Sequence, residues 1–480
     1  MQVLTGKAKV FSLLGLAVVA MGGLALGWMV AQEHFLWLGA VGLVAFLVLC
    51  LVHPILVASL ALGSAFIPFL LFPVADVGEF TIRYVDGATA TLALVILLRL
   101  FVQRRNPFGK EWWIIFKPLL PFLVYVGLSL VLVWIYIPDN LAISLASYVR
   151  LMNTVLLGSL IYMSIRGKKD VRFIARVIVM LAVASIAVGI WEAWASLQRE
   201  ALVAGRYGGL LGFNTFGLAA GLLVLWAVIT RANRGPVLVW VIPLVAGILG
   251  LFLSKSGSST LATIGSILFF WIAFRSKGSA QATWPLRLVL GGVVGGALAM
   301  WALWLLRPAD FAGLVSLSGG SWAQRAMIAY GALRIFLSHP LFGVGWQASS
   351  TEAVIGDPTL NEVLMQAFLR LPAHYFFLER PTSLHNLYMQ LLAELGIVGL
   401  SLFAYGVVRV GKTVAGLLKE IPSQSSFRPL ALFYAIGLVY LLIWWNTNPL
   451  YGGQTESMLA AGFLSLLAAL WRLQRQNYKA

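Results

Sequence analysis

The residues best suited to chemistry lie within a short stretch near the end of this sequence. His385, Asn386, Gln390 and Glu394 stand where a polar segment runs into an apolar run. In a strongly apolar chain, ionisable and amide side chains at such a boundary need a reason. An imidazole with an ordinary pKa of about 6.5 can take a proton from a hydroxyl group and return it. We therefore interpret His385 as a general base, with a helix-capping or otherwise satisfied interfacial histidine as the alternative.

The spacing of the polar residues after His385 predicts how they share a helix. Asn386, Gln390 and Glu394 follow one another at intervals of four and form one stripe, whereas Glu394 lies on roughly the opposite face from His385. Glu394 is therefore not expected to orient His385 directly. We expect Glu394 and Gln390 to support the structure between helices, with substrate contact as the alternative for Glu394, and Asn386 to contact substrate.

The elements that must position these residues are membrane helices. The 480 residues are 60% hydrophobic and 11% charged, with a mean hydropathy of +0.91, far from the balance of a soluble domain. Apolar runs long enough to cross a bilayer recur from end to end, and the first is too long for a cleavable signal peptide. We predict an all-α polytopic membrane protein with about 14 spans, at 9–31, 35–52, 54–73, 88–103, 112–136, 145–165, 172–196, 209–230, 236–253, 258–274, 284–306, 385–408, 429–447 and 457–473. This divides the chain into helices 1–11 over residues 1–306, a large loop over 307–384, and helices 12–14 over 385–480.

The charged residues predict which side of the membrane each loop occupies. The net charge is +17, and most basic residues fall in alternate loops, while most acidic residues fall in the others. The positive-inside rule then places both termini in the cytoplasm and the 307–384 loop outside. The excess of basic residues reflects the membrane topology of the chain, so a nucleic-acid partner is not expected.

A few basic residues lie on the predicted outer side, against this tendency. Arg206 precedes a span that carries Asn214, Lys255 interrupts an outer turn, and Arg325 lies in the large loop. They are expected to bind an anion, with snorkelling to lipid headgroups as the alternative. Because the planar guanidinium group makes paired hydrogen bonds to phosphate, Arg206 and Arg325 together suit a diphosphate.

The loop over 307–384 is the one stretch outside the predicted spans that is long enough to fold by itself. Apolar residues recur at helical spacing from Trp322 to Phe336, before Ser338-His339-Pro340 ends the pattern, and again over 359–371. Gly343 and Gly345 mark a turn between the two segments. We expect two amphipathic helices at the outer interface, with a merely solvated cap as the alternative.

Several common chemistries have no signature in this sequence. We find no group of His, Cys, Asp and Glu at metal-ligand spacing, no phosphate-binding loop of the GxxxxGK[ST] type and no GxSxG elbow. The lone Cys50 excludes an intrachain disulfide. We expect chemistry that needs neither a metal nor a cofactor.

Four motifs together resemble the O-antigen ligase and polymerase superfamily. They are the string from His385-Asn386 to Glu394-x-Gly396, the turn His339-Pro340-Leu341-Phe342-Gly343-Val344-Gly345, the segment Arg206-Tyr207-Gly208-Gly209-Leu210-Leu211-Gly212-Phe213-Asn214, and Trp322-Ala323-Gln324-Arg325. They occur in the family's order over the C-terminal two thirds of the chain. Where many relatives have Ser-Arg, this chain has Lys255-Ser256-Gly257, so Lys255 is a substitute for that arginine under this resemblance.

The resemblance implies a metal-independent, GT-C-like membrane glycosyltransferase in the bacterial inner membrane. The donor would be an undecaprenyl-diphosphate-linked glycan, His385 the catalytic histidine, and Arg206 and Arg325 the diphosphate ligands. The acceptor would be a lipid A core for a ligase or another lipid-linked glycan for a polymerase, and a protein oligosaccharyltransferase remains open.

A glycan transporter or flippase is the alternative from another class. It should show two halves related by hydropathy symmetry, with broken helices near the midplane, whereas the notable charges here gather at one surface. The oligomeric state is not determined by the sequence.

Overall fold

The structure is a computed structural model of the whole chain. It describes residues 53–63, 66, 73–77, 80–83, 93–94, 96–97, 109–197, 213–274, 325–355, 357–368, 384–422, 424–448, 450 and 455–477. Arg206 and the predicted spans over 9–31, 35–52 and 284–306 lie outside these residues, as does most of the span over 88–103.

The described part of the chain is almost entirely helical, which confirms the predicted fold class. Its helices are α3 (Pro54–Gly63), α5 (Lys110–Phe116), α6 (Leu120–Tyr136), α7 (Leu141–Ser164), α8 (Lys168–Leu197), α9 (Phe213–Ala232), α10 (Val237–Ser254), α11 (Gly257–Phe274), α14 (Glu352–Ile355), α15 (Pro358–Ala367), α16 (Leu387–Glu420), α17 (Arg428–Trp444) and α18 (Thr455–Asn477). Short 3-10 turns occupy Lys117–Leu119, Pro138–Asn140 and Trp445–Thr447, the last labelled η7. The sequence did not predict the one antiparallel pair, β1 (Pro73–Val77) with β2 (Phe80–Arg83).

Seven helices in the described part of the chain are long and apolar enough to cross a membrane, and three more are shorter apolar helices. Nine predicted spans from 112–136 onward correspond to α5–α6, α7, α8, α9, α10, α11, α16, α17 and α18. Of the predicted span over 54–73, α3 covers Pro54–Gly63 and β1 begins at Pro73, while most of the residues between them lie outside the described part of the structure. The total of about 14 remains a prediction.

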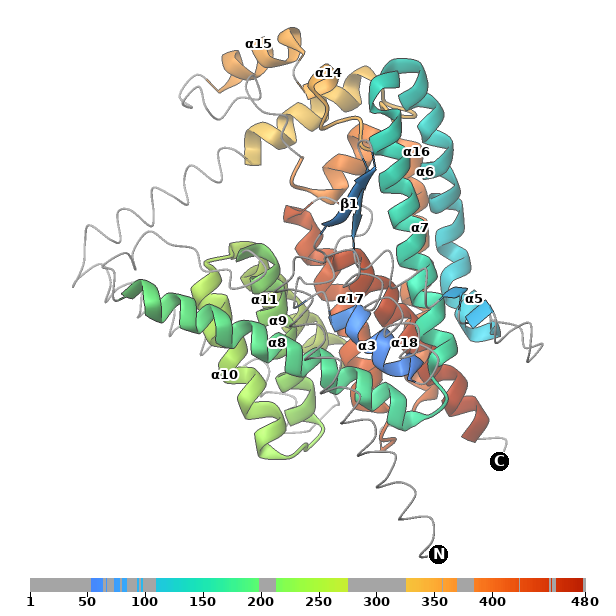
Figure 1. Cartoon of the computed structure of the whole chain (residues 1–480), viewed down its shortest axis with the longest axis vertical. Helices are drawn as coiled ribbons and strands as arrows, with labels where there is room; N and C mark the ends of the chain where they lie inside the picture. Colours follow the sequence, from blue (N-terminus) through green and yellow to red (C-terminus); the bar gives the residue numbers. More distant parts are fainter. Residues whose placement is uncertain are drawn as a thin grey trace, which may run out of the picture.

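The core of the bundle is formed by α9, α17 and α18. The helix α17 packs against α9, α11 and α18, and α18 also packs on α7 (Figure 1). Fully buried aromatic residues fill this centre, among them Tyr434, Tyr440 and Phe463. The peripheral helices instead expose large apolar side chains, such as Leu128 on α6 and Phe252 on α10. Exposed apolar side chains on long helices are the surface expected next to lipid, so the protein is a membrane protein.

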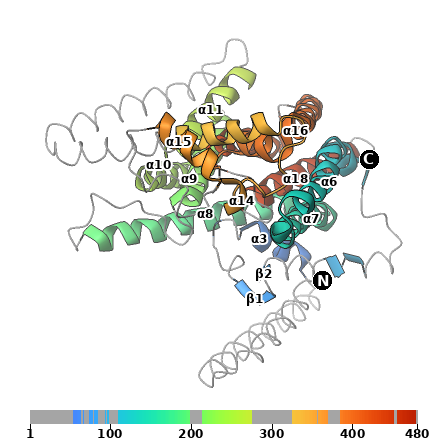
Figure 2. The same ribbon diagram turned by 90° about the horizontal axis from the view of Figure 1, so that it is seen from above.

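The described part of the large loop lies at one end of the bundle. A helix over residues 325–338, here called the loop helix, confirms the first predicted loop helix, and α15 confirms the second in a shorter form. The loop helix, α14 and α15 lie together above the ends of α6, α7 and α16 (Figure 1), and Figure 2 shows them from above.

The opposite end of the bundle carries basic residues where helices meet. The guanidinium group of Arg472 on α18 donates to the carbonyl oxygens of Tyr162 and Ile165 at the end of α7. Arg475 lies 3.6 Å from the Glu420 carboxylate at the end of α16. This is the end that the positive-inside rule assigns to the cytoplasm.

Candidate active site

A break in α16 holds the glycine turn of the large loop. Gly396 has φ 64° and ψ −166°, so the helical hydrogen-bond ladder is interrupted there. The carbonyl oxygens that lose their helical partners accept from the turn instead. Val344 N–H donates to Ala393 O at 3.1 Å, and Gly345 N–H donates to Glu394 O at 2.8 Å. Backbone groups inside a membrane protein must find partners, and the turn provides them.

The same break frees two backbone N–H groups, and the residues before the turn accept from them. Ile397 N–H donates to Pro340 O at 2.9 Å, and Val398 N–H donates to Leu341 O at 3.3 Å. The turn and the broken helix thus satisfy each other in both directions. This reciprocity is the physical reason that the two motifs occur together in the sequence.

Only glycine fits at the contact points between the turn and the helix. A Cβ atom at Gly343 would lie 2.3 Å from the backbone of Glu394, and one at Gly396 would lie 2.3 Å from the carbonyl oxygen of Leu341. Gly343 and Gly345 also have φ values of 72° and 101°, which favour glycine. Gly343 therefore lets the loop approach α16 closely, and Gly345 lets it approach Val133 on α6.

Replacing Gly396 with alanine is expected to destabilise the protein by about 1–3 kcal/mol from backbone strain alone, before the clash with Leu341 is counted. Gly411 is the matched control, because it lies in the same helix with open space where its Cβ would be. Gly411→Ala should be neutral or slightly stabilising. Thermal unfolding of the purified protein in detergent compares the two, and equal melting temperatures would contradict the packing described here.

The carboxylate of Glu394 is buried next to this break and accepts several hydrogen bonds. Glu394 is 1% exposed. Ser349 Oγ donates to Oε1 at 2.5 Å, Gln390 Nε2 donates to Oε2 at 3.1 Å, and the backbone N–H groups of Gln347 and Ser349 also donate to the carboxylate. The predicted pairing of Gln390 and Glu394 on one helical face is therefore confirmed. Glu394 joins α16 to the segment that follows the glycine turn.

The side chain of Gln390 extends this network to the segment between α17 and α18. Its Oε1 accepts from Leu450 N–H at 2.8 Å, and its Nε2 donates to Leu450 O at 3.3 Å. Gln347 Nε2 donates to the same carbonyl oxygen at 3.3 Å. Because these groups are buried and bonded to one another, the network fixes three separate chain segments at this end of the bundle.

His385 lies at the end of the helix bundle, two residues before α16 begins. Its backbone has φ 45°, a left-handed conformation that a non-glycine residue rarely adopts. Strained residues of this kind persist where the surrounding structure holds them, often at functional sites. His385 keeps a solvent-accessible face, so a substrate hydroxyl group can reach the imidazole.

Arg325 begins the loop helix and acts on His385 electrostatically. Partial removal from water lowers the pKa of His385 below its ordinary value of 6.5, and the positive charge of Arg325 lowers it further. The imidazole is therefore neutral at ambient pH, which is the form that accepts a proton. Two of the three predicted site residues, far apart in the sequence, thus lie close enough to interact.

Asn386 has a structural role that the sequence did not predict. Its Oδ1 accepts from the N–H groups of Tyr388 and Met389 at 2.9 and 3.1 Å, which caps α16. Its Nδ2 donates to the backbone and side-chain oxygens of Asn446 at 2.8 and 3.1 Å, which ties the residue after His385 to η7. The substrate contact of Asn386 remains a prediction.

Lys255 lies in the turn between α10 and α11, in a left-handed conformation with φ 48°. The serines around it are buried, and Ser256 Oγ lies 3.0 Å from Ser259 Oγ. Ser259 Oγ also accepts from Trp444 Nε1 at 3.2 Å, two residues before Asn446. The Lys255 turn and the start of α16 are therefore both fixed to the end of α17.

The start of α9 packs against the same turn. A Cβ atom at Gly217 would lie 2.6 Å from Ser259 Oγ, so the two segments are in close contact. Asn214 stands one turn earlier on α9, and its side chain lies outside the described part of the structure. Arg206 lies outside it altogether. Its convergence with Arg325 and His385 therefore remains a prediction.

Asn446, Ser349 and Gln347 are supporting residues that sequence reasoning missed. Each lies in a loop or 3-10 turn, with no spacing pattern to single it out from the polar residues around it. No group of three metal-ligating side chains occurs within the described residues.

The fold and this group of residues define a polytopic membrane protein with an imidazole and a guanidinium group brought together at one end of its helix bundle. A family model described as O-antigen ligase matches residues 242–404, about a third of the chain, and this match confirms the predicted resemblance to the O-antigen ligase and polymerase superfamily. The matched segment includes Lys255, Arg325, the glycine turn, His385 and Glu394, while Arg206 and Asn214 lie before it. No curated protein matches the chain.

Proposed function

We propose that the protein transfers or polymerises an undecaprenyl-diphosphate-linked glycan at the outer face of the bacterial cytoplasmic membrane. The observation that supports this proposal is the electrostatic effect of Arg325 on His385, which adds to the effect of burial in lowering the pKa of the imidazole. The family match supports a glycosyl-transferring membrane enzyme. Both termini lie in the cytoplasm in this proposal.

The proposed reaction is a single displacement with inversion at the anomeric carbon. The neutral imidazole of His385 takes the proton from an acceptor hydroxyl group as its oxygen bonds to the anomeric carbon. The bond from that carbon to the diphosphate oxygen breaks, and the lipid diphosphate leaves with the electron pair. Arg325 and Arg206 stabilise the negative charge that grows on this leaving group, and Lys255 assists from its turn.

In this scheme, the charge of the bound donor changes the pKa of His385, the proposed general base. In the free enzyme, Arg325 favours neutral His385. A bound diphosphate pairs with Arg325 and offsets its positive charge, so the pKa of His385 rises when the donor is present. The imidazole is thus unprotonated before the substrate binds and becomes more basic when it must accept a proton.

The supporting residues give the site its rigidity. Asn386 fixes His385 through Asn446, while Glu394 and Gln390 fix α16 to the glycine turn. A base held within hydrogen-bond reach of its substrate is more effective than a mobile one, because orientation lowers the entropic part of the barrier.

The acceptor distinguishes the remaining members of this class. A ligase would use a lipid A core and a polymerase another lipid-linked glycan, and an oligosaccharyltransferase would use a protein. The purified protein, incubated with undecaprenyl-diphosphate-linked oligosaccharide and a chelator, is expected to change the carrier or the length of the glycan. Gel electrophoresis and mass spectrometry of the product read this out. Lengthening without a core acceptor identifies a polymerase, and an unchanged donor with every acceptor class contradicts the proposed function.

A further inference from the structure

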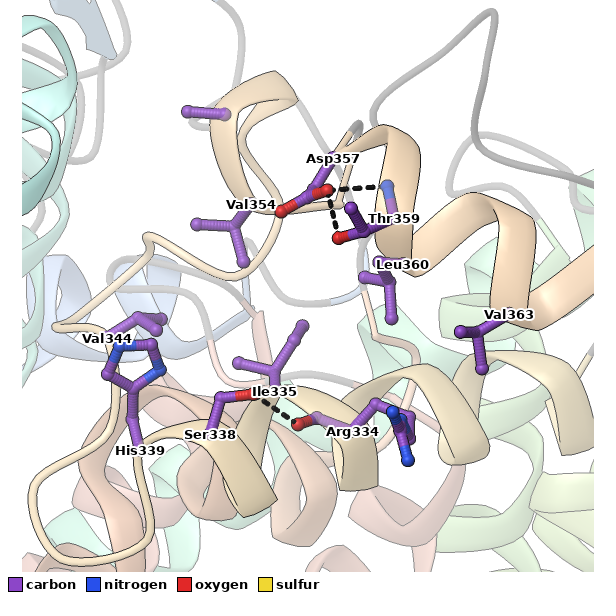
Figure 3. Close-up of a pocket in the computed structure, with 11 residues that line it drawn as sticks. Arg334, Ile335, Ser338, His339, Val344, Val354, Asp357, Thr359, Leu360 and Val363 are labelled. Carbon is purple, nitrogen blue, oxygen red and sulfur yellow. Dashed lines mark hydrogen bonds between the residues drawn. The ribbon is translucent and has the colours of Figure 1, made fainter.

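A pocket of about 260 Å³ lies between the loop helix and α15, on the outer side of the bundle. Figure 3 shows Arg334, Ser338 and His339 lining it from the loop helix and its end, with Asp357 and Thr359 on the opposite side. His385 and Arg325 do not line it. The pocket is therefore separate from the candidate active site.

The polar groups of this pocket have balanced charge. Arg334 is a cation with hydrogen-bond donors only. Hydrogen bonds from the Thr359 hydroxyl and backbone N–H to Asp357 Oδ1, at 2.5 and 2.7 Å, hold the pKa of that carboxyl below its ordinary value, so Asp357 is an anionic acceptor. Arg334 and Asp357 do not pair with each other in this part of the structure. An opposed donor and acceptor without net charge suit a hydroxyl-bearing ligand and not a diphosphate.

The remaining lining adds mainly apolar surface. Ile335, Val344 and Leu360 contribute aliphatic surface, which can pack on the apolar face of a sugar ring. The ring of His339 lies at the end of the loop helix and packs edge-on against Tyr136, with 5.6 Å between the ring centroids.

The pocket has a fixed relation to the candidate active site. Arg334 follows Arg325 by nine residues in the loop helix, which places it about 14 Å along the helix axis and on the opposite face. Val344 lies within the glycine turn that is clamped to α16. A glycan whose reacting end lies at His385 would therefore pass across the loop helix as well as along it to place a more distant sugar in this pocket.

We propose that this pocket binds an uncharged sugar residue of the glycan chain, a few units from the reacting bond. The proposal rests on the proposed function for the position of that bond. The sugar can belong to the donor glycan or to the acceptor glycan, because the pocket chemistry is the same for both.

The first test measures binding without catalysis. The probe is the oligosaccharide released by mild acid from the lipid-linked pool of the source cells, separated by length. The full-length protein in nanodiscs should bind the longer fractions in saturation-transfer NMR. Val363→Phe, which fills the pocket, and Arg334→Gln, which removes the charged donor, should each weaken binding by about tenfold or more. Met365→Phe adds the same ring to the exposed face of α15 and should bind normally.

The second test uses transfer by the same variants. With a donor or acceptor that carries a single sugar, Val363→Phe should match the wild type, while with longer chains its KM should rise by about tenfold at an unchanged kcat. A KM that rises with donor length assigns the sugar to the donor, and one that rises with acceptor length assigns it to the acceptor.

The two proposals fail in different ways. Normal binding of long fractions by both Val363→Phe and Arg334→Gln, or a KM independent of glycan length in both arms, overturns the sugar pocket while transfer itself continues. Absence of transfer by the wild type contradicts the proposed function, and the binding test still decides whether the pocket holds a sugar.

Discussion

His385→Asn is expected to lower kcat by about 10²–10⁴-fold, because it removes the group that accepts the proton from the acceptor hydroxyl. Asparagine is the chosen replacement because it tolerates the left-handed conformation of residue 385 better than alanine does. The measurement is the initial rate of glycan transfer at saturating donor.

Two controls separate loss of the base from loss of the fold. His385→Asn should keep the melting temperature of the wild type, and His385→Ala should lose the same activity despite its greater strain. Imidazole added to a His385→Gly variant should restore part of the rate, since a free base can enter the space that the ring leaves. A folded His385→Asn protein that transfers glycan at the normal rate would eliminate His385 as the base.

Arg325→Gln is expected to lower kcat/KM by about 10²–10³-fold, the usual effect of removing one donor that stabilises charge in a transition state. Arg325→Lys should also be impaired, although it retains the positive charge, because a lysine cannot make the paired hydrogen bonds of a guanidinium group. A neutral result for both variants would favour simple contact with lipid headgroups.

The pH dependence of the transfer rate separates two roles of Arg325, its effect on the pKa of His385 and its stabilisation of the leaving diphosphate. The base must be neutral, so kcat/KM should fall as the pH drops through the pKa of His385, which lies below 6.5 in the free enzyme. The acid limb of kcat should lie at higher pH, because the bound diphosphate offsets Arg325. Arg325→Gln should move the acid limb of kcat/KM upward toward 6.5, and Arg325→Lys should leave it in place. An acid limb that does not move in Arg325→Gln would exclude the electrostatic coupling.

The helices could be predicted largely from apolar runs, because a bilayer requires about 20 apolar residues for each crossing. The runs over 112–136 and 236–253 correspond to α6, with α5 before it, and to α10. At the end of the run over 54–73, hydropathy does not register that Pro73 begins a strand. The β1–β2 pair has no signal in a sequence read for membrane spans.

Part of the candidate site could also be predicted. Local spacing placed Gln390 and Glu394 on one face, and they do hydrogen-bond. The structural partner of Asn386 could not be predicted, because Asn446 is distant in the sequence and nothing local indicates it. The electrostatic effect of Arg325 on His385 depends on how the large loop folds back over the bundle.

The sequence by itself determined a helical membrane protein with basic residues on alternate loops, and it singled out His385 and the glycine turn as unusual within an apolar chain. These properties are local, since hydropathy, charge and backbone preference belong to short segments. The tertiary structure decided that the glycine turn fills the break in α16, that Asn446 anchors the start of that helix, and that Arg325 lies beside His385. Such contacts join residues that are distant along the chain, and only the packing of the helices brings them together.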